Sequence, residues 1–95
     1  MPLTQLEAEL RAIARERIGS GRLPCLGSPR TWGGKGSGKV CDLCDREIRP
    51  GEAEIEIEEH TDEGEVHSLR FHVVCQSVWQ LECARIDHLR NHPKT

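Results

Sequence analysis

The sequence predicts a small α+β domain in which a helix and an irregular connector precede a β-hairpin and a second helix. Two observations predict this class. The period of the apolar residues changes along the chain from that of a helix to that of a strand and back again. Only 36% of the 95 residues are hydrophobic and only three are aromatic, a composition typical of a soluble domain with a thin core. We therefore expect a bound metal ion or a covalent cross-link to add to its stability.

The first element is an amphipathic helix within residues 1–19. Apolar residues recur at helical spacing (Leu6, Leu10, Ile13 and Ala14), while glutamate and arginine side chains occupy the other faces. Gly19 fits a C-terminal stop, because glycine adopts the left-handed conformation that often ends helices. With about four turns the helix would be marginal alone in water. Its apolar stripe therefore needs a partner, either in this chain or in another.

Residues 20–39 are rich in Gly, Ser and Pro and are typical of a flexible basic linker. Trp32 is the one large aromatic side chain in this stretch, and we expect it to dock on its own domain. The last part, "GGKGSGK" at residues 33–39, matches a phosphate-binding loop in part. Val40 follows where such a loop needs Ser or Thr, and no apolar strand precedes it, so nucleotide binding is not expected.

Two alternating runs predict a β-hairpin. Residues 53–59, "AEIEIEE", alternate apolar and acidic side chains, and residues 65–71, "EVHSLRF", alternate again after the turn sequence "TDEG". The first run places Ala53, Ile55 and Ile57 inward and Glu54, Glu56 and Glu58 outward. The second places His67, Leu69 and Phe71 on one face.

A second helix is predicted from about residue 72 to residue 91, with Pro93 just beyond its end. Its buried side is expected to contain Val74 or Cys75, Val78, Trp79, Glu82, Ile86 and Leu89. Glu82 is an exception in this apolar stripe for which the sequence offers no explanation. His88 and His92 are four residues apart at the end of this helix, and an exposed, frayed end is favoured there over a metal pair.

Two pairs of metal-ligand residues frame the hairpin. Cys41 and Cys44 form one pair and His72 and Cys75 the other, each with two residues between its members. That spacing lets both side chains of a pair converge on one ion, and two pairs supply four tetrahedral ligands. Thiolate and imidazole donors favour zinc over magnesium or calcium. We therefore predict a zinc-stabilised domain, residues 40–92, with one structural zinc ion per chain in a closed Cys3His site.

The remaining cysteines are Cys25 and Cys83. The chain has neither a run of about 18 apolar residues nor the apolar segment of a secretory signal, so a membrane location is not expected. A cytoplasmic, reducing location is the expectation, and there all five cysteines stay reduced. Cys83 is expected to pack beneath the second helix. For Cys25 three roles stay open: an exposed thiol, a small buried side chain, or a substitute metal ligand. Cys25 and Cys83 are both candidate reactive thiols.

The order of a Cys-x2-Cys knuckle, a hairpin and a helix that opens with the second ligand pair resembles a treble-clef zinc finger. Within that group it resembles the first half of a LIM domain and the poly(ADP-ribose) polymerase-type finger. The insertion between the pairs, residues 45–71, has 27 residues, near the polymerase-type spacing, and "CDLCDREIRPGE" and "RFHVVC" are similar to that family. The resemblance covers residues 38–89 and implies a zinc-stabilised finger.

The polymerase-type finger also implies recognition of DNA ends through a basic hairpin surface. The hairpin of this chain instead carries acidic residues: Glu52, Glu54, Glu56, Glu58, Glu59, Asp62, Glu63 and Glu65. Contacts to phosphate need Lys and Arg. The acidic surface would repel a duplex, so the DNA-binding function is not expected to accompany the fold.

The function favoured by the sequence is that of a non-enzymatic adaptor. No nucleophile with a paired base is recognisable, and a closed site leaves no position for a catalytic water. The likeliest partner is another protein, bound through the acidic hairpin or the N-terminal helix.

Two alternatives follow from the charge and the thiols. Residues 11–40 carry seven basic side chains and one acidic one, a balance of +6, whereas residues 41–65 carry two basic and eleven acidic ones, a balance of −9. This split indicates attraction between the two halves or two partner surfaces. The basic segment is a candidate nucleic-acid contact through Arg15, Arg17, Arg22, Arg30, Trp32, Lys35 and Lys39. A thiol-based redox or metal sensor using Cys25 or Cys83 is the other alternative.

Overall fold

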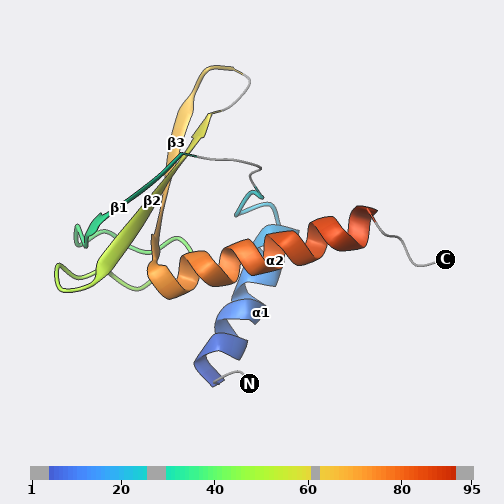
Figure 1. Cartoon of the computed structure of the whole chain (residues 1–95), viewed down its shortest axis with the longest axis horizontal. Helices are drawn as coiled ribbons and strands as arrows, with labels where there is room; N and C mark the ends of the chain where they lie inside the picture. Colours follow the sequence, from blue (N-terminus) through green and yellow to red (C-terminus); the bar gives the residue numbers. More distant parts are fainter. Residues whose placement is uncertain (1–4, 26–29, 61–62, 92–95) are drawn as a thin grey trace.

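The computed structural model describes residues 5–25, 30–60 and 63–91 (Figure 1). The elements are α1 (Gln5–Gly19), β1 (Arg30–Lys35), β2 (Ala53–His60), β3 (Val66–His72) and α2 (Val73–Asn91). The strands form one antiparallel sheet in the order β1-β2-β3, α2 packs against β2 and β3, and α1 packs against α2. The predicted α+β class, both helices and the hairpin are confirmed.

The hydrophobic core lies where the two helices and the sheet meet. Phe71 of β3 stacks on Trp79 of α2, with ring centroids 5.2 Å apart, and Leu10 and Ala14 of α1 are buried in the same cluster. The full buried set is Leu10, Ala14, Leu23, Cys41, Leu43, Ile48, Ile57, Phe71, Cys75, Val78, Trp79 and Cys83. Leu10, Ala14 and in part Ile13 of the predicted stripe therefore find their partner within this chain, whereas Leu6 is exposed.

Strand β1 corrects the prediction of a flexible linker, residues 20–39, for residues 30–35. It pairs with β2 along its whole length, with Arg30 opposite Glu58 and Trp32 opposite Glu56. All six residues of β1 are exposed, and Trp32 keeps 46% of its surface accessible. Because no side chain of this strand enters the core, the strand lacks the alternation by which sequence reasoning detects strands.

The glycine-rich stretch after β1 follows a close backbone path. A Cβ atom on Gly36 would lie 1.9 Å from the carbonyl oxygen of Arg49, so no other residue fits without a backbone shift. The amide of Gly36 donates to the carbonyl of Glu52 at 2.8 Å, and that of Gly38 donates to Ile48 at 2.9 Å. These glycines bring the chain beside residues 48–52, which explains the composition that resembled a phosphate-binding loop.

Glu82 of α2, the unexplained polar residue of the predicted stripe, is the centre of a buried ion cluster. Its carboxylate is 0% exposed and accepts hydrogen bonds from the Nε atoms of Arg11 at 2.8 Å, Arg15 at 2.8 Å and Arg85 at 2.9 Å. Two of these arginines belong to α1. The cluster therefore joins α1 to α2 beside the apolar contact.

The predicted inward and outward faces of β2 are partly wrong. Glu54, expected outward, is buried, while Ala53, expected inward, is exposed. Glu54 accepts hydrogen bonds from the backbone N–H of Ser37 at 3.0 Å and from its hydroxyl at 2.6 Å, and Arg70 lies 3.4 Å away. The loop after β1 therefore covers this carboxylate, which a two-stranded hairpin would leave in solvent.

The buried side of α2 is predicted correctly at Cys75, Val78 and Trp79 and wrongly at Leu89, which is exposed. The C-terminal part of α2 extends past the sheet and α1 (Figure 1). Apolar periodicity alone does not reveal where the packing partner of a helix ends.

Candidate metal centre

The first two candidate ligands lie in a tight turn before the hairpin. The amide of Cys41 donates to the carbonyl of Arg46 at 2.8 Å, and the amide of Asp45 donates back to the carbonyl of Cys41 at 3.1 Å. Asp45 has a φ of 63°, the left-handed conformation that asparagine and aspartate tolerate better than most residues. An antiparallel bridge between Val40 and Glu47 closes the turn, so that the cysteines point to one side.

The other two candidate ligands lie where β3 passes directly into α2. His72 is the last residue of β3, and Cys75 belongs to the first turn of α2, which begins at Val73. Two hydrogen bonds join the turn to this junction. The amide of Asp42 donates to the carbonyl of Arg70 at 2.8 Å, and the amide of Arg70 donates to the Asp42 carboxylate at 2.7 Å.

The turn is also held by α1. Arg17 donates to the carbonyl of Asp42 at 2.8 Å and to the carboxylate of Asp45 at 2.5 Å, and its side chain is largely buried. This pairing raises the pKa of Arg17, and the same contact lowers the pKa of the Asp45 carboxyl. The N-terminal helix thus supports the turn from which Cys41 and Cys44 project.

The four predicted ligands come together. The ligand atoms of Cys41, Cys44, His72 and Cys75 all lie within 4.8 Å of one another. Nδ1 of His72 lies 3.4 Å from the sulfur of Cys44 and 3.9 Å from that of Cys75. Metal–ligand bonds of about 2.0–2.3 Å in a tetrahedron separate neighbouring ligands by about 3.5–3.8 Å. These distances therefore fit a tetrahedral metal ion.

The orientation of His72 also fits a metal ligand. Its Nε2 atom lies 3.3 Å from the carbonyl oxygen of Glu47 and 3.5 Å from the carboxylate of Glu52. A proton on Nε2 donates toward these oxygens and leaves the lone pair on Nδ1, the nitrogen that faces the sulfurs. Metal-binding histidines are usually oriented in this way by an acceptor on the second nitrogen.

The three thiols compete for one negative charge. A hydrogen bond from Cys75, opposed by burial and aided by backbone N–H groups, lowers the pKa of Cys41 to about 4. The hydrogen bond that Cys75 gives Cys41, together with burial, raises the pKa of Cys75, and burial with the nearby charge of Cys41 raises that of Cys44. Cys41 and Cys75 are 0% and 2% exposed. The donor set therefore suits a cation that compensates several thiolates away from water.

The predicted nucleic-acid contacts differ in their surroundings. Arg15 is paired with Glu82, and Arg17 is buried against the turn. The other candidates are exposed: Arg22, Arg30, Trp32, Lys35 and Lys39. Two of the seven predicted contacts are thus occupied by internal ion pairs.

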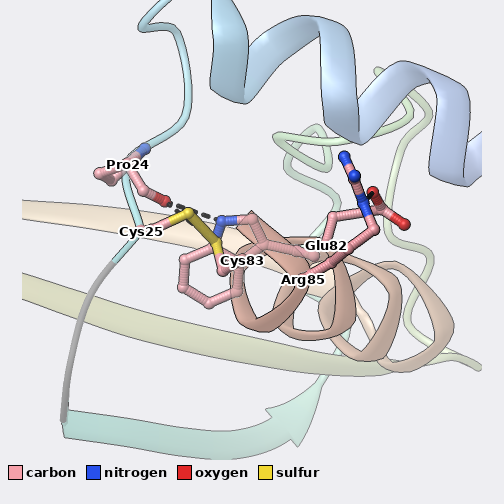
Figure 2. The surroundings of a disulfide bond; sticks show 6 residues. Pro24, Cys25, Glu82, Cys83 and Arg85 are labelled. Atoms are coloured by element: carbon pink, nitrogen blue, oxygen red, sulfur yellow. Dashed lines mark hydrogen bonds and ion pairs between the residues drawn. A yellow bond between two sulfur atoms is a disulfide. The ribbon is translucent and has the colours of Figure 1, made fainter. Parts of the chain in front are cut away.

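Cys25 and Cys83 differ from the expectation that all cysteines stay reduced. They form a disulfide between the segment after α1 and the middle of α2 (Figure 2). Cys83 is nearly buried, as expected, and Cys25 is exposed. The two are 58 residues apart, so no local pattern identifies them as partners. Neither helix in the described part of the chain combines the length and the apolar character needed to cross a membrane.

His88 lies in the exposed last turns of α2, and His92 lies outside the described residues. Within residues 5–25, 30–60 and 63–91, the Cys3His group is the one set of at least three such side chains that can hold a metal ion.

Comparisons of the chain with protein-family models, with curated proteins and with solved structures gave no match. The class of the site is therefore defined by its geometry: a Cys3His group in a small α+β domain, able to hold one metal ion.

Proposed function

We propose that the chain binds one zinc ion through Cys41, Cys44, His72 and Cys75, and that the metal has a structural role. The observation that supports this is the convergence of four ligand atoms within 4.8 Å. Three sulfurs and one imidazole favour zinc, and four protein ligands fill a tetrahedral coordination sphere. The order of turn, hairpin and helix resembles that of a treble-clef finger, and a third strand lies beside the hairpin.

Matched variants of two histidines on β3 test the metal proposal. Native mass spectrometry is expected to find one zinc ion in the wild-type chain and none in His72→Ala, together with loss of the folded circular dichroism spectrum. His67→Ala is the control, because His67 lies on the same strand but is exposed and far from the ligand group. A wild-type chain that folds without metal contradicts a structural role, and zinc retained in His72→Ala contradicts the ligand set.

We further propose that the protein is a non-enzymatic adaptor in the cytoplasm that binds another protein through the tip of its hairpin. Strand β1 covers β2 only from Ala53 to Glu58. The hairpin extends beyond β1 (Figure 1), and that extension carries Glu59, Glu63 and Glu65, none of which lies opposite a residue of β1. Its charge suits a partner with a basic surface. The alternative through α1 is less favoured, because α1 is packed on α2.

Affinity capture with two forms of the chain tests the adaptor proposal. The wild-type chain is expected to retain a specific protein, and a variant with Glu59, Glu63 and Glu65 changed to Gln is expected to lose it while keeping its zinc. Because the contact is electrostatic and exposed, binding should also weaken as salt rises. Equal capture by both forms contradicts the assignment of this surface.

Nucleic-acid binding is a second candidate function because of β1. Trp32 is exposed on β1, and Arg30 lies two residues before it on the same face of the strand, so an aromatic ring with a cation beside it is available to a single strand. A labelled single-stranded oligonucleotide titrated at increasing salt tests this candidate. Steeply salt-dependent binding that Trp32→Ala abolishes supports it, and absence of binding at low salt removes it.

A further inference from the structure

We propose that Cys25 and Cys83 form a reversible disulfide whose reactants are low-molecular-weight thiols such as glutathione. Their Cα atoms are 5.5 Å apart, within the range found for disulfides. The other three cysteines of the chain belong to the metal centre. The chain therefore divides its cysteines into a ligand set and an exchangeable pair.

The two sets are separated along α2. Cys75 and Cys83 are eight residues apart on this helix, which corresponds to about 12 Å at 1.5 Å per residue. Direct exchange between Cys83 and Cys75 would require this helix to unwind. The disulfide can therefore open and close while the ligand set keeps its ion.

The disulfide holds the segment after α1 against α2. The carbonyl of Pro24 accepts a hydrogen bond from the indole N–H of Trp79 at 2.9 Å, and Leu23 is buried in the core. The amide of Leu23 also donates to the carbonyl of Arg17 at 3.1 Å. Figure 2 shows Pro24 and Cys25 facing the turn of α2 that carries Glu82 and Cys83. Opening the disulfide would leave this segment held to α2 by the indole contact and to α1 by the Leu23 amide, with the Leu23 side chain still in the core.

Attack by a small thiol is expected at Cys25. Cys25 is exposed, whereas Cys83 is 9% exposed and its sulfur lies 3.9 Å from the carbonyl oxygen of Pro24. A glutathione thiolate forms a bond to the sulfur of Cys25, the bond between the two cysteines breaks, and Cys83 leaves as a thiolate that takes a proton from water. The resulting thiol can donate to the Pro24 carbonyl.

A second glutathione thiolate completes the reaction. It attacks the glutathione sulfur of the mixed disulfide, which releases the Cys25 thiolate and one molecule of oxidised glutathione. In total, the protein disulfide and two reduced glutathione molecules give a protein dithiol and one oxidised glutathione. Two electrons pass to the protein, and the reverse sequence returns them.

The test uses the zinc-loaded full chain in buffers with graded ratios of reduced to oxidised glutathione. Samples are quenched in acid and alkylated, and the modified cysteines are mapped by peptide mass spectrometry. Cys25 and Cys83 are expected to change state together, and Cys83→Ala is expected to accumulate a glutathione adduct on Cys25 because no second thiol resolves it. Cys25→Ser should carry at least tenfold less adduct on Cys83, since Cys83 is buried.

Zinc is measured in the same samples by native mass spectrometry, so that failure of the metal proposal and failure of the exchange proposal are distinguishable. An unchanged zinc content across the redox series is the expected result. An adduct mainly on Cys83, or disulfides that include Cys41, Cys44 or Cys75, would overturn the proposal. So would the absence of a disulfide between Cys25 and Cys83 in oxidised glutathione.

Trp79 provides a separate readout of the segment held by the disulfide. In a Trp32→Phe background the tryptophan emission comes from Trp79 alone. Reduction is expected to shift this emission to longer wavelength, because release of Pro24 admits water to the indole N–H. Unchanged emission after complete reduction would show that the disulfide does not hold the segment, and would overturn that part of the proposal.

Discussion

The buried carboxylate of Glu82 makes a quantitative prediction about how α1 is held. Three arginines donate to it, and although burial itself raises the pKa of a carboxyl group, these donors lower that of Glu82 from 4.5 to about 2. Each tenfold change in proton affinity is worth about 1.4 kcal/mol. The charged form of Glu82 therefore stabilises the fold by about 3 kcal/mol at neutral pH, a large part of the roughly 5–15 kcal/mol of a typical domain.

Glu82→Gln removes the charge while keeping the shape of the side chain. We predict that the free energy of unfolding falls by about 2–3 kcal/mol, toward the lower value because the arginines are partly exposed and the amide oxygen still accepts a hydrogen bond. Urea unfolding followed by circular dichroism, with zinc content measured in parallel, tests this value. Glu9→Gln on the exposed side of α1 is the control and should change stability by less than about 0.5 kcal/mol.

The sign of the pH dependence follows from the lowered pKa of Glu82. The contribution of Glu82 is complete above the unfolded value of 4.5 and is lost as the pH falls toward 2. The stability difference between wild type and Glu82→Gln should therefore be constant from about pH 8 to about pH 5.5 and should shrink in stronger acid. Zinc thiolates also take up protons in acid, so both chains are compared at each pH. A difference below about 0.5 kcal/mol at neutral pH, or one that grows with acid, would refute the reasoning.

Three further outcomes are expected. Gly36→Ala should lower the free energy of unfolding by at least about 2 kcal/mol, because the added Cβ would meet the Arg49 carbonyl. Gly34→Ala, whose Cβ would have nothing within 4 Å, is the control and should lower it by less than about 0.5 kcal/mol. Similar urea midpoints for the two variants would contradict the close approach at Gly36. Leu10→Ala should cost about 2–4 kcal/mol while the zinc content of the folded chain stays unchanged, because Arg17 still supports the ligand turn. Loss of zinc from the folded variant would contradict this expectation. An excess of a zinc chelator should abolish the folded circular dichroism spectrum, and a spectrum unaffected by the chelator would contradict the structural role of the metal.

The sequence predicts the candidate metal centre more completely than the strands, for a physical reason. Ligand pairs such as Cys41 and Cys44 are local, and their spacing alone brings two donors to one point. The hairpin and α2 are also local patterns of period two and 3.6. Together they bring the pairs to one place, so the site could be predicted without knowledge of the other contacts.

The contacts that sequence reasoning missed join segments far apart in the chain. Arg11 meets Glu82 across 71 residues, and Cys25 meets Cys83 across 58. A buried glutamate in an apolar stripe was the one local signal of the ion cluster, because such a group needs cationic partners. The spacing of three residues on one helix points to Arg85, but nothing local indicates Arg11 and Arg15.

The division of charge along the chain connects the fold to the proposed partner surface. The basic segment lies partly on the acidic one, since Arg17 pairs with Asp45 and β1 places Arg30 opposite Glu58. Part of the opposite charge of residues 11–40 (+6) and residues 41–65 (−9) is therefore used in attraction between these two segments. Within the described residues, β1 pairs with β2 no further than Glu58, so the acidic residues nearer the hairpin tip are not opposite this strand. The start of β1 at Arg30 thus marks how far the described part of this strand reaches along the acidic hairpin, and the proposed basic partner would bind beyond it.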